Sequence, residues 1–203
     1  MNPRFADLKK IPKEPAARML AVANARLKAP LKAPASAALP VVLEELESQG
    51  ALIDMLRLLS VALPPRERTW WACLAARDLL GPGATKVPAP LLAAEQWVFK
   101  PGDDTRNATR AALDAADSDD DTTLCATCVI FCDGMLGTGD LAKLPGPPGA
   151  SQAAAFGMNL LALSRVGGDF PSMANRFIDR ALDIARGGNG RLAETATSAG
   201  GAA

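Results

Sequence analysis

The chain has 203 residues, of which 49% are hydrophobic and 22% charged, a composition that suits one globular domain with a buried core. Its 22 lysines and arginines balance its 22 aspartates and glutamates, so no general attraction to nucleic acid or anionic lipid is expected. Histidine, the commonest general base and metal ligand, is absent. Tyrosine is also absent and aromatic residues make up only 4%, which disfavours a platform on which nucleic-acid bases would stack.

The N-terminal region lacks the pattern of a secretory signal. Residues 1–28 carry several charges and no clean apolar run, and the longest apolar runs of the chain fall short of the roughly 18 residues that a membrane span needs. We therefore expect a cytoplasmic protein with reduced thiols and no membrane insertion.

Helical patterns follow one another along the chain, bounded by proline at their starts and glycine at their ends. Residues 1–14 are expected to form an extended N-terminal arm. No segment alternates with period two for long enough to predict a strand. The expected helical segments cover residues 15–27, 40–48, 51–63, 65–80, 90–99, 103–116, 122–136, 151–167 and 171–186.

These patterns predict an all-α fold, a compact bundle of about eight helices. Residues 122–136 and 151–167 are apolar nearly all round, so they are expected to be two buried helices. Residues 15–187 are expected to form a single helical domain. Residues 188–203, which are rich in glycine, alanine, serine and threonine, are expected to be a disordered tail.

The segment "PRERTWWACLAARDLL" (65–80) carries adjacent tryptophans among charges. On a helical wheel, three alanines and Leu79 form one smooth face, while Trp70 lies between Arg66 and Arg77 on the other. Two interpretations are open: both tryptophans pack under neighbouring helices, or this arc is a partner-docking patch, since Trp and Arg dominate binding hot spots. We expect a split, with Trp71 in the core and Arg66, Trp70 and Arg77 as partner-binding residues.

Three cysteines, Cys125, Cys128 and Cys132, form one stripe of a predicted helix, and Cys73 lies in another. A metal or iron–sulfur site would need a fourth ligand and a loop that wraps the metal, whereas buried cysteine commonly packs as a small hydrophobe. We expect core packing, with no metal and no cofactor.

Two further motifs have weak functional interpretations. "DSDDD" (117–121) lacks the glycine and distal glutamate of a calcium loop, so it is expected to cap the following helix. "GMLGTGD" (134–140) follows a helix and precedes a proline-rich loop, the wrong context for a phosphate-binding loop, so it is expected to be a plain loop.

Several stretches together resemble a bacterial domain family of unknown function that is associated with type VI secretion gene neighbourhoods. The resemblance is carried by "LPPRERTWWACLAARDLL", "AAEQWVFKPGDDTRNATRAALDAA" and "CDGMLGTGDLAKLPGPP", followed by a final helical pair at 151–187, and covers about residues 40–187. It implies an accessory, adaptor or chaperone role and brings no catalytic residues.

We therefore expect a non-enzymatic, protein-binding accessory protein whose partner is a component or effector of a type VI secretion system. No nucleic-acid partner is expected. Two alternatives remain: a small redox or metal-binding protein that uses Cys125, Cys128 and Cys132, and a purely structural subunit of a larger assembly.

Overall fold

The computed structural model describes residues 2–192, and this part of the chain is entirely helical apart from its loops, with no β-strand. The predicted all-α fold is confirmed. The described residues form nine α-helices and two short 3-10 helices: α1 (Ala16–Val22), α2 (Leu39–Ser48), α3 (Leu52–Ala62), α4 (Pro65–Leu80), α5 (Ala89–Phe99), α6 (Asp103–Asp114), α7 (Thr123–Ile130), α8 (Ala150–Arg165), α9 (Phe170–Arg186), η1 (Pro3–Phe5) and η2 (Gly139–Lys143).

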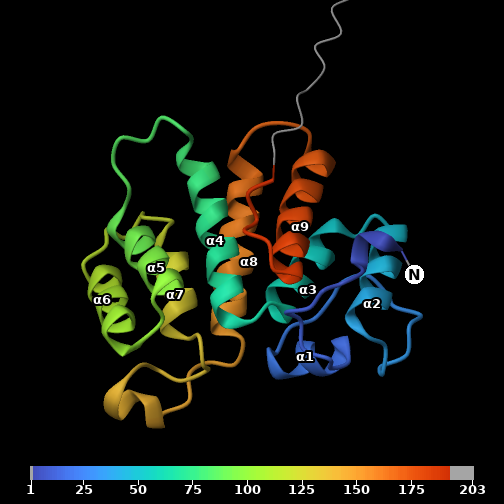
Figure 1. The fold of residues 1–203 in the computed structure, drawn as a ribbon, viewed down its shortest axis with the longest axis horizontal. Coiled ribbons are helices and arrows are strands. Elements are labelled where there is room, and N and C mark those ends of the chain that lie inside the picture. Colours follow the sequence, from blue (N-terminus) through green and yellow to red (C-terminus); the bar gives the residue numbers. More distant parts are fainter. Residues whose placement is uncertain (1, 193–203) are drawn as a thin grey trace, which may run out of the picture.

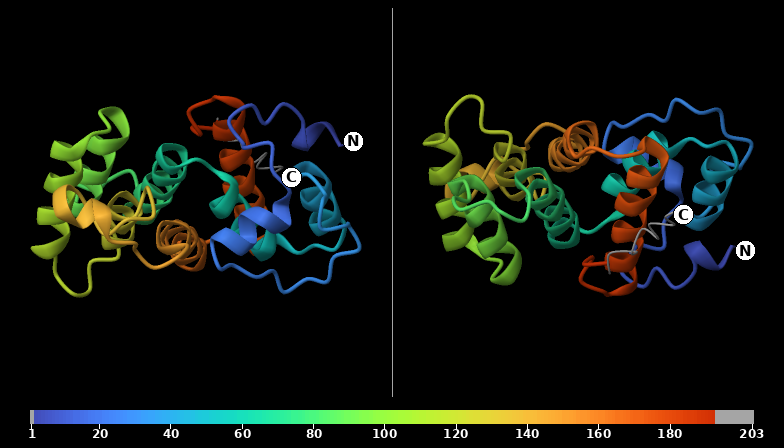
Figure 2. Two further views of the ribbon diagram at one scale, coloured as in Figure 1. Left: turned by 90° about the horizontal axis from the view of Figure 1, so that it is seen from below. Right: turned by 90° about the horizontal axis from the view of Figure 1, so that it is seen from above.

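Two central helices, α4 and α8, pack against each other and separate two groups of helices (Figure 1). Helices α5, α6 and α7 lie on one side, and helices α1, α2, α3 and α9 lie on the other. The views from above and below show the same order (Figure 2). Because α4 contacts members of both groups, its side chains face different neighbours in different directions.

Local sequence explains where the helices begin and end. Proline occupies one of the first two positions of α2, α4, α5 and α9, where its missing N–H costs nothing. The side chain of Asp169 caps α9 by accepting a hydrogen bond from the N–H of Ser172 at 3.1 Å. Gly187 ends the same helix with φ of 109°, a backbone conformation that favours glycine.

The two helices expected to be buried, α7 and α8, do lie in the interior, but α7 is shorter than predicted. It ends at Ile130 rather than at residue 136. Arg106 of α6 donates hydrogen bonds to the carbonyl of Ile130 and to the carboxylate of Asp133, and Gly134 then turns the chain with φ of 81°. The buried guanidinium therefore binds the turn that replaces the predicted last helical turn.

The arm at residues 2–14 packs on the domain. The ring of Phe5 is 1% exposed and belongs to the same hydrophobic core as α3, α4 and α9. Leu8 and Ile11 of the arm also pack against this core. The arm is thus part of the folded structure rather than a free extension.

The expected tail begins too early at residue 188. The segment after α9 turns back between α4 and α9 (Figure 1). Arg180 donates to the carbonyl of Gly190 at 3.1 Å, and the N–H of Gly190 donates to Asp183 at 2.8 Å. Residues 188–192 are therefore held against the domain, and the rest of the predicted tail, 193–203, lies outside the described residues.

Among residues 2–192, no helix is both long enough and apolar enough to cross a bilayer.

Candidate functional site

The two adjacent tryptophans of α4 lie in opposite environments, as the helical wheel predicted. Trp71 is 0% exposed, and its indole N–H donates to the carbonyl of Phe177 at 3.0 Å. Trp70 is half-buried, and its indole N–H donates to the carbonyl of Asn189 at 2.7 Å. The rings of Trp70 and Phe99 meet edge to face, with centroids 5.6 Å apart and planes at 61°. The ring of Phe99 itself is 68% exposed.

A groove of about 480 Å³ opens beside Trp70. It is built by four segments that are distant in sequence: the N-terminal arm, the first half of α4, the end of α5, and the end of α9 with the segment that follows. Its floor is apolar and its rim carries charges. The lining residues are Lys10, Arg66, Glu67, Trp70, Val98, Phe99, Ile184, Gly188, Asn189 and Arg191.

Three cations and one carboxylate surround the aromatic pair. The ammonium of Lys10 pairs with Glu67 at 2.7 Å. Arg66 uses its Nε to donate to the carbonyl of Val98 at 2.6 Å, and the guanidinium of Arg191 lies 5.7 Å from the centre of the Trp70 ring. Within residues 2–192 neither arginine has a carboxylate at ion-pair distance. The groove therefore holds positive charge that the described residues leave unneutralised.

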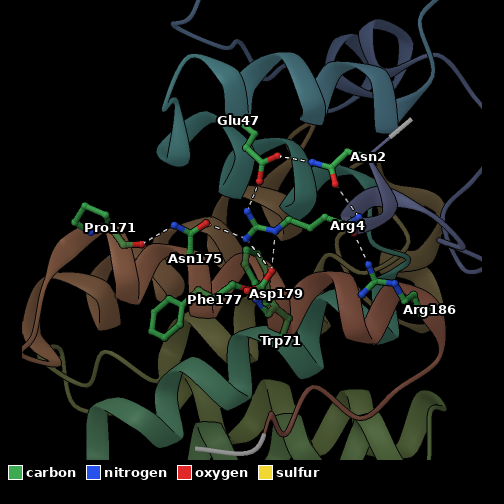
Figure 3. A network of polar contacts seen from close by, with 9 residues as sticks. All are labelled: Asn2, Arg4, Glu47, Trp71, Pro171, Asn175, Phe177, Asp179 and Arg186. Carbon is green, nitrogen blue, oxygen red and sulfur yellow. Dashed lines mark hydrogen bonds and ion pairs between the residues drawn. The ribbon is translucent and has the colours of Figure 1, made fainter. Parts of the chain in front are cut away.

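The arm reaches the groove because a polar network anchors it further back (Figure 3). Arg4 pairs with Glu47 of α2 and, at 2.7 Å, with Asp179 of α9, and it also donates to Asn175 at 2.9 Å. Further along the arm, the backbone N–H of Lys10 donates to the carbonyl of Ala185 at 2.9 Å. This second attachment places the Lys10 side chain over Glu67.

Arg77, the third predicted partner-binding residue, does not line the groove. It pairs with Glu95 of α5 through two contacts of 2.8 and 2.6 Å, and this hydrogen bonding raises the pKa of Arg77. A wheel places Arg77 on the same arc as Trp70, but the two residues are about two turns apart along the axis. At that level Arg77 pairs with α5 instead, so the structure joins Arg66 and Trp70 and separates Arg77 from them.

Residues 42–185 match a family described as "Family of unknown function (DUF6931)". The chain belongs to this family. No curated protein and no solved structure matches the chain. The match bears out the resemblance to a family of unknown function.

The DUF6931 match covers only part of the groove. Arg66, Trp70 and Phe99 lie inside the matched residues, whereas Lys10, Asn189 and Arg191 lie outside them. The aromatic floor thus belongs to the family region, and two of the three cations come from the flanking segments of this chain.

A second site on α4, which sequence reasoning missed, lies inside the family region and is fully enclosed. The buried guanidinium of Arg68 donates to the carbonyls of Ser60 and Leu63, both at 2.8 Å, and to the hydroxyl of Ser151 at 3.1 Å. Ser151 in turn donates to the carbonyl of Cys128 at 2.9 Å. We call these residues the Arg68 junction. Burial lowers the pKa of Arg68 to about 10. The junction ties the end of α3 to α4, α7 and α8.

The cysteines lie mainly in the core. Cys73, Cys125 and Cys128 are fully buried and Cys132 is half-buried. A hydrogen bond with Cys73, followed by burial, raises the pKa of Cys125, and burial raises the pKa of Cys128 and of Cys132. Raised pKa values leave few thiolates, the form that reacts and binds metal. Among residues 2–192, no three or more side chains of the metal-binding types gather into a candidate metal site.

The two weaker motifs have structural roles. In "DSDDD", Asp120 accepts from the N–H and hydroxyl of Thr122 at 2.9 and 2.7 Å, just before α7, and Asp121 pairs with Arg165. In "GMLGTGD", the N–H of Leu136 donates to the carbonyl of Leu144 at 2.9 Å, closing a loop. The loop predicted at 134–140 is present. The capping predicted for 117–121 is not: Asp120 holds the turn that leads into α7, and the N-cap residue of this helix, Thr122, makes no side-chain capping hydrogen bond.

Proposed function

We propose that the chain is a non-enzymatic, protein-binding adaptor that docks a partner in the groove beside Trp70. The observation that carries this proposal is the exposure of an aromatic pair between two guanidinium groups that lack a carboxylate partner within the described residues. Trp and Arg are among the residues most enriched in binding hot spots, and covering Phe99, which is 68% exposed, with a partner's apolar surface is favourable.

The enclosed Arg68 junction offers no comparable access. Its guanidinium already has three acceptors, and the neighbouring Cys128 is fully buried with a raised pKa. A thiol in that setting is a poor nucleophile and a poor metal ligand. Docking at the groove therefore has more support than redox or metal chemistry at the cysteines.

The setting that we propose for this adaptor is a bacterial type VI secretion system, with an apparatus component or an effector as partner and a chaperone-like or adaptor role in the cytoplasm. The support for this setting is the sequence resemblance alone. Affinity capture of the full chain from its native cells, followed by mass spectrometry, would identify the partner and test the setting.

Site-specific photo-crosslinking tests the groove directly. A photoreactive phenylalanine analogue replaces Phe99 in the full chain, and the matched control replaces Phe170, which is 49% exposed at the start of α9 and outside the groove. After irradiation in native cells, we expect a discrete crosslinked partner from position 99 and none from position 170. The same products from both positions, or none from position 99, would contradict docking at the groove.

A further inference from the structure

We propose that the groove beside Trp70 selects an acidic peptide segment that carries an apolar or aromatic anchor residue. This inference rests on the proposed docking function and adds the chemistry of the partner. It assigns the anchor to the Trp70–Phe99 floor and the acidic residues to Arg66 and Arg191.

The local charge supports an acidic partner. Lys10, Arg66 and Arg191 carry three positive charges and Glu67 carries one negative charge, so the groove lining has a net charge of 3 − 1 = +2. The whole chain has a net charge of zero, so this excess belongs to the groove. Glu67 already pairs with Lys10, and the charge that remains for a ligand is that of the two arginines. Complementary charge across an interface speeds association and disfavours partners of like charge.

The geometry of the arginines suits carboxylates. The guanidinium of Arg191 lies 5.7 Å from the centre of the Trp70 ring, within cation–π range, and a guanidinium can bind a carboxylate through two parallel hydrogen bonds. Arg66 uses its Nε for the carbonyl of Val98, which fixes the side chain and leaves its terminal N–H groups without an acceptor among the described residues. Arg66 is therefore held in place before a ligand arrives, and Arg191 lies within cation–π range of Trp70.

The floor requires an apolar group on the same ligand. Val98 and Ile184 are almost fully buried beneath the groove, and Trp70 has already satisfied its indole N–H with the carbonyl of Asn189. What Trp70 and Phe99 offer is therefore ring surface, which an aliphatic or aromatic side chain covers best. A purely acidic segment would leave this surface exposed to water.

A nucleic-acid strand fits the groove less well than a peptide. Binding of single strands uses successive ring faces on which bases stack. Here the two rings meet edge to face at 61°, and Arg191 lies over Trp70. The groove thus offers one apolar position between charges, which matches a peptide side chain flanked by carboxylates.

Selection from a displayed library of random 12-residue peptides tests the inference, with the full chain as bait and its Trp70→Ala variant for counter-selection. We expect the selected peptides to be enriched in Asp and Glu around an aromatic or aliphatic residue. Neutral or basic peptides, or no peptide that depends on Trp70, would overturn the inference. It would also fall if a 12-nucleotide oligo-dT bound more tightly than the selected peptides.

Charge reversal then tests the assigned residues. Arg66→Glu and Arg191→Glu should each weaken a selected peptide by about tenfold or more, because each replaces attraction with repulsion beside the ligand. Arg26→Glu, an exposed arginine elsewhere, should leave the affinity unchanged. Equal effects at all three positions would contradict a specific role for Arg66 and Arg191.

Other occupants of the groove give different results. Self-association that Trp70→Ala abolishes would place a second copy in the groove, and tighter peptide binding by a chain ended at Leu192 would place the chain's own last residues there. Either result overturns the inference. A crosslinked partner at position 99 together with non-acidic peptides would leave the docking function standing and remove only the partner chemistry.

Discussion

Two regions on the same helix handle arginine in opposite ways. In the Arg68 junction, a buried guanidinium donates three hydrogen bonds, two to carbonyl oxygens and one to a hydroxyl oxygen. In the groove, two residues earlier on α4, Arg66 is exposed, and among residues 2–192 its side chain donates to one carbonyl, through its Nε. Arg68 therefore finds its hydrogen-bond acceptors within the fold, whereas Arg66 keeps N–H donors that another molecule can bind.

The tryptophans repeat this contrast one residue apart. Trp71 fills the core beneath α9, and Trp70 borders the groove. The difference teaches that α4 has an inner side, whose side chains hold the helices together, and an outer side. The outer side chains are ordered, but some of their hydrogen-bond donors and ring surface have no partner among the described residues. Substitutions on the inner side should therefore change stability, and those on the outer side should change binding.

The largest effect is expected from Trp71→Ala. Removing a fully buried indole loses apolar contact and leaves a cavity, so the free energy of unfolding should fall by about 3–5 kcal/mol. Urea unfolding followed by circular dichroism measures this, and Trp71→Phe, which retains much of the volume, serves as the control with a smaller loss. A loss below that of Trp70→Ala would reverse the assignment of inner and outer sides.

Arg68→Met should come next. It leaves three acceptors without their donor, and since an unsatisfied buried group costs about 1–3 kcal/mol, we expect a net loss of about 2–4 kcal/mol after the gain from no longer burying a charge. Arg66→Met is the matched control on the exposed side and should change stability by about 0.5 kcal/mol or less. If Arg68→Met were neutral, the cost of desolvating the charge would fully offset its hydrogen bonds, which would contradict a stabilising junction.

A smaller effect is expected at the pair between Arg77 and Glu95. Its side chains are partly exposed, so a double-mutant cycle with alanine at each position should give a coupling of about 0.2–1 kcal/mol. Partner capture should be unchanged in Arg77→Ala, because this residue joins α4 to α5 away from the groove. Loss of capture without loss of folding would restore Arg77 as a binding residue.

The reactivity of the four cysteines should also distinguish buried from accessible positions, and this test needs no destabilising substitution. With a thiol reagent at pH 8 we expect Cys132 to react first, because it is half-buried, and the fully buried Cys73, Cys125 and Cys128 to react only as the protein unfolds. Cys132→Ser should remove the fast phase and leave the slow one. A fast phase that persists in this variant would mean that the core around α7 opens readily.

Sequence periodicity was sufficient for the presence and order of the helices and for the split between Trp70 and Trp71, because both depend on spacing within one segment. It did not give every boundary, since the first helix was expected to reach residue 27 and ends at Val22. A wheel projects along the axis, so it placed Arg77 beside Trp70 and did not show that Arg77 pairs with Glu95 of α5 away from the groove. The end of α7 was missed for a similar reason, since Arg106 lies 24 residues before the carbonyl that it binds.

The remaining groove residues depend on contacts that no local pattern encodes. Phe99 closes a short helix in the sequence, and nothing there indicates that its ring meets Trp70. Arg191 falls in a segment whose composition predicted disorder, yet Asn189 beside it binds Trp70 across 119 positions. Buried polar partners at such separations, including Ser151 for Arg68, are fixed by packing and not by periodicity.

The most direct test of the groove is the affinity of Trp70→Ala for the partner that crosslinks through position 99. We expect this variant to keep its helical circular dichroism spectrum and to lose about 1 kcal/mol of stability, while its affinity falls by about tenfold or more, since Trp at the centre of an interface is a common hot spot. An unchanged affinity in the folded variant would contradict docking at the groove.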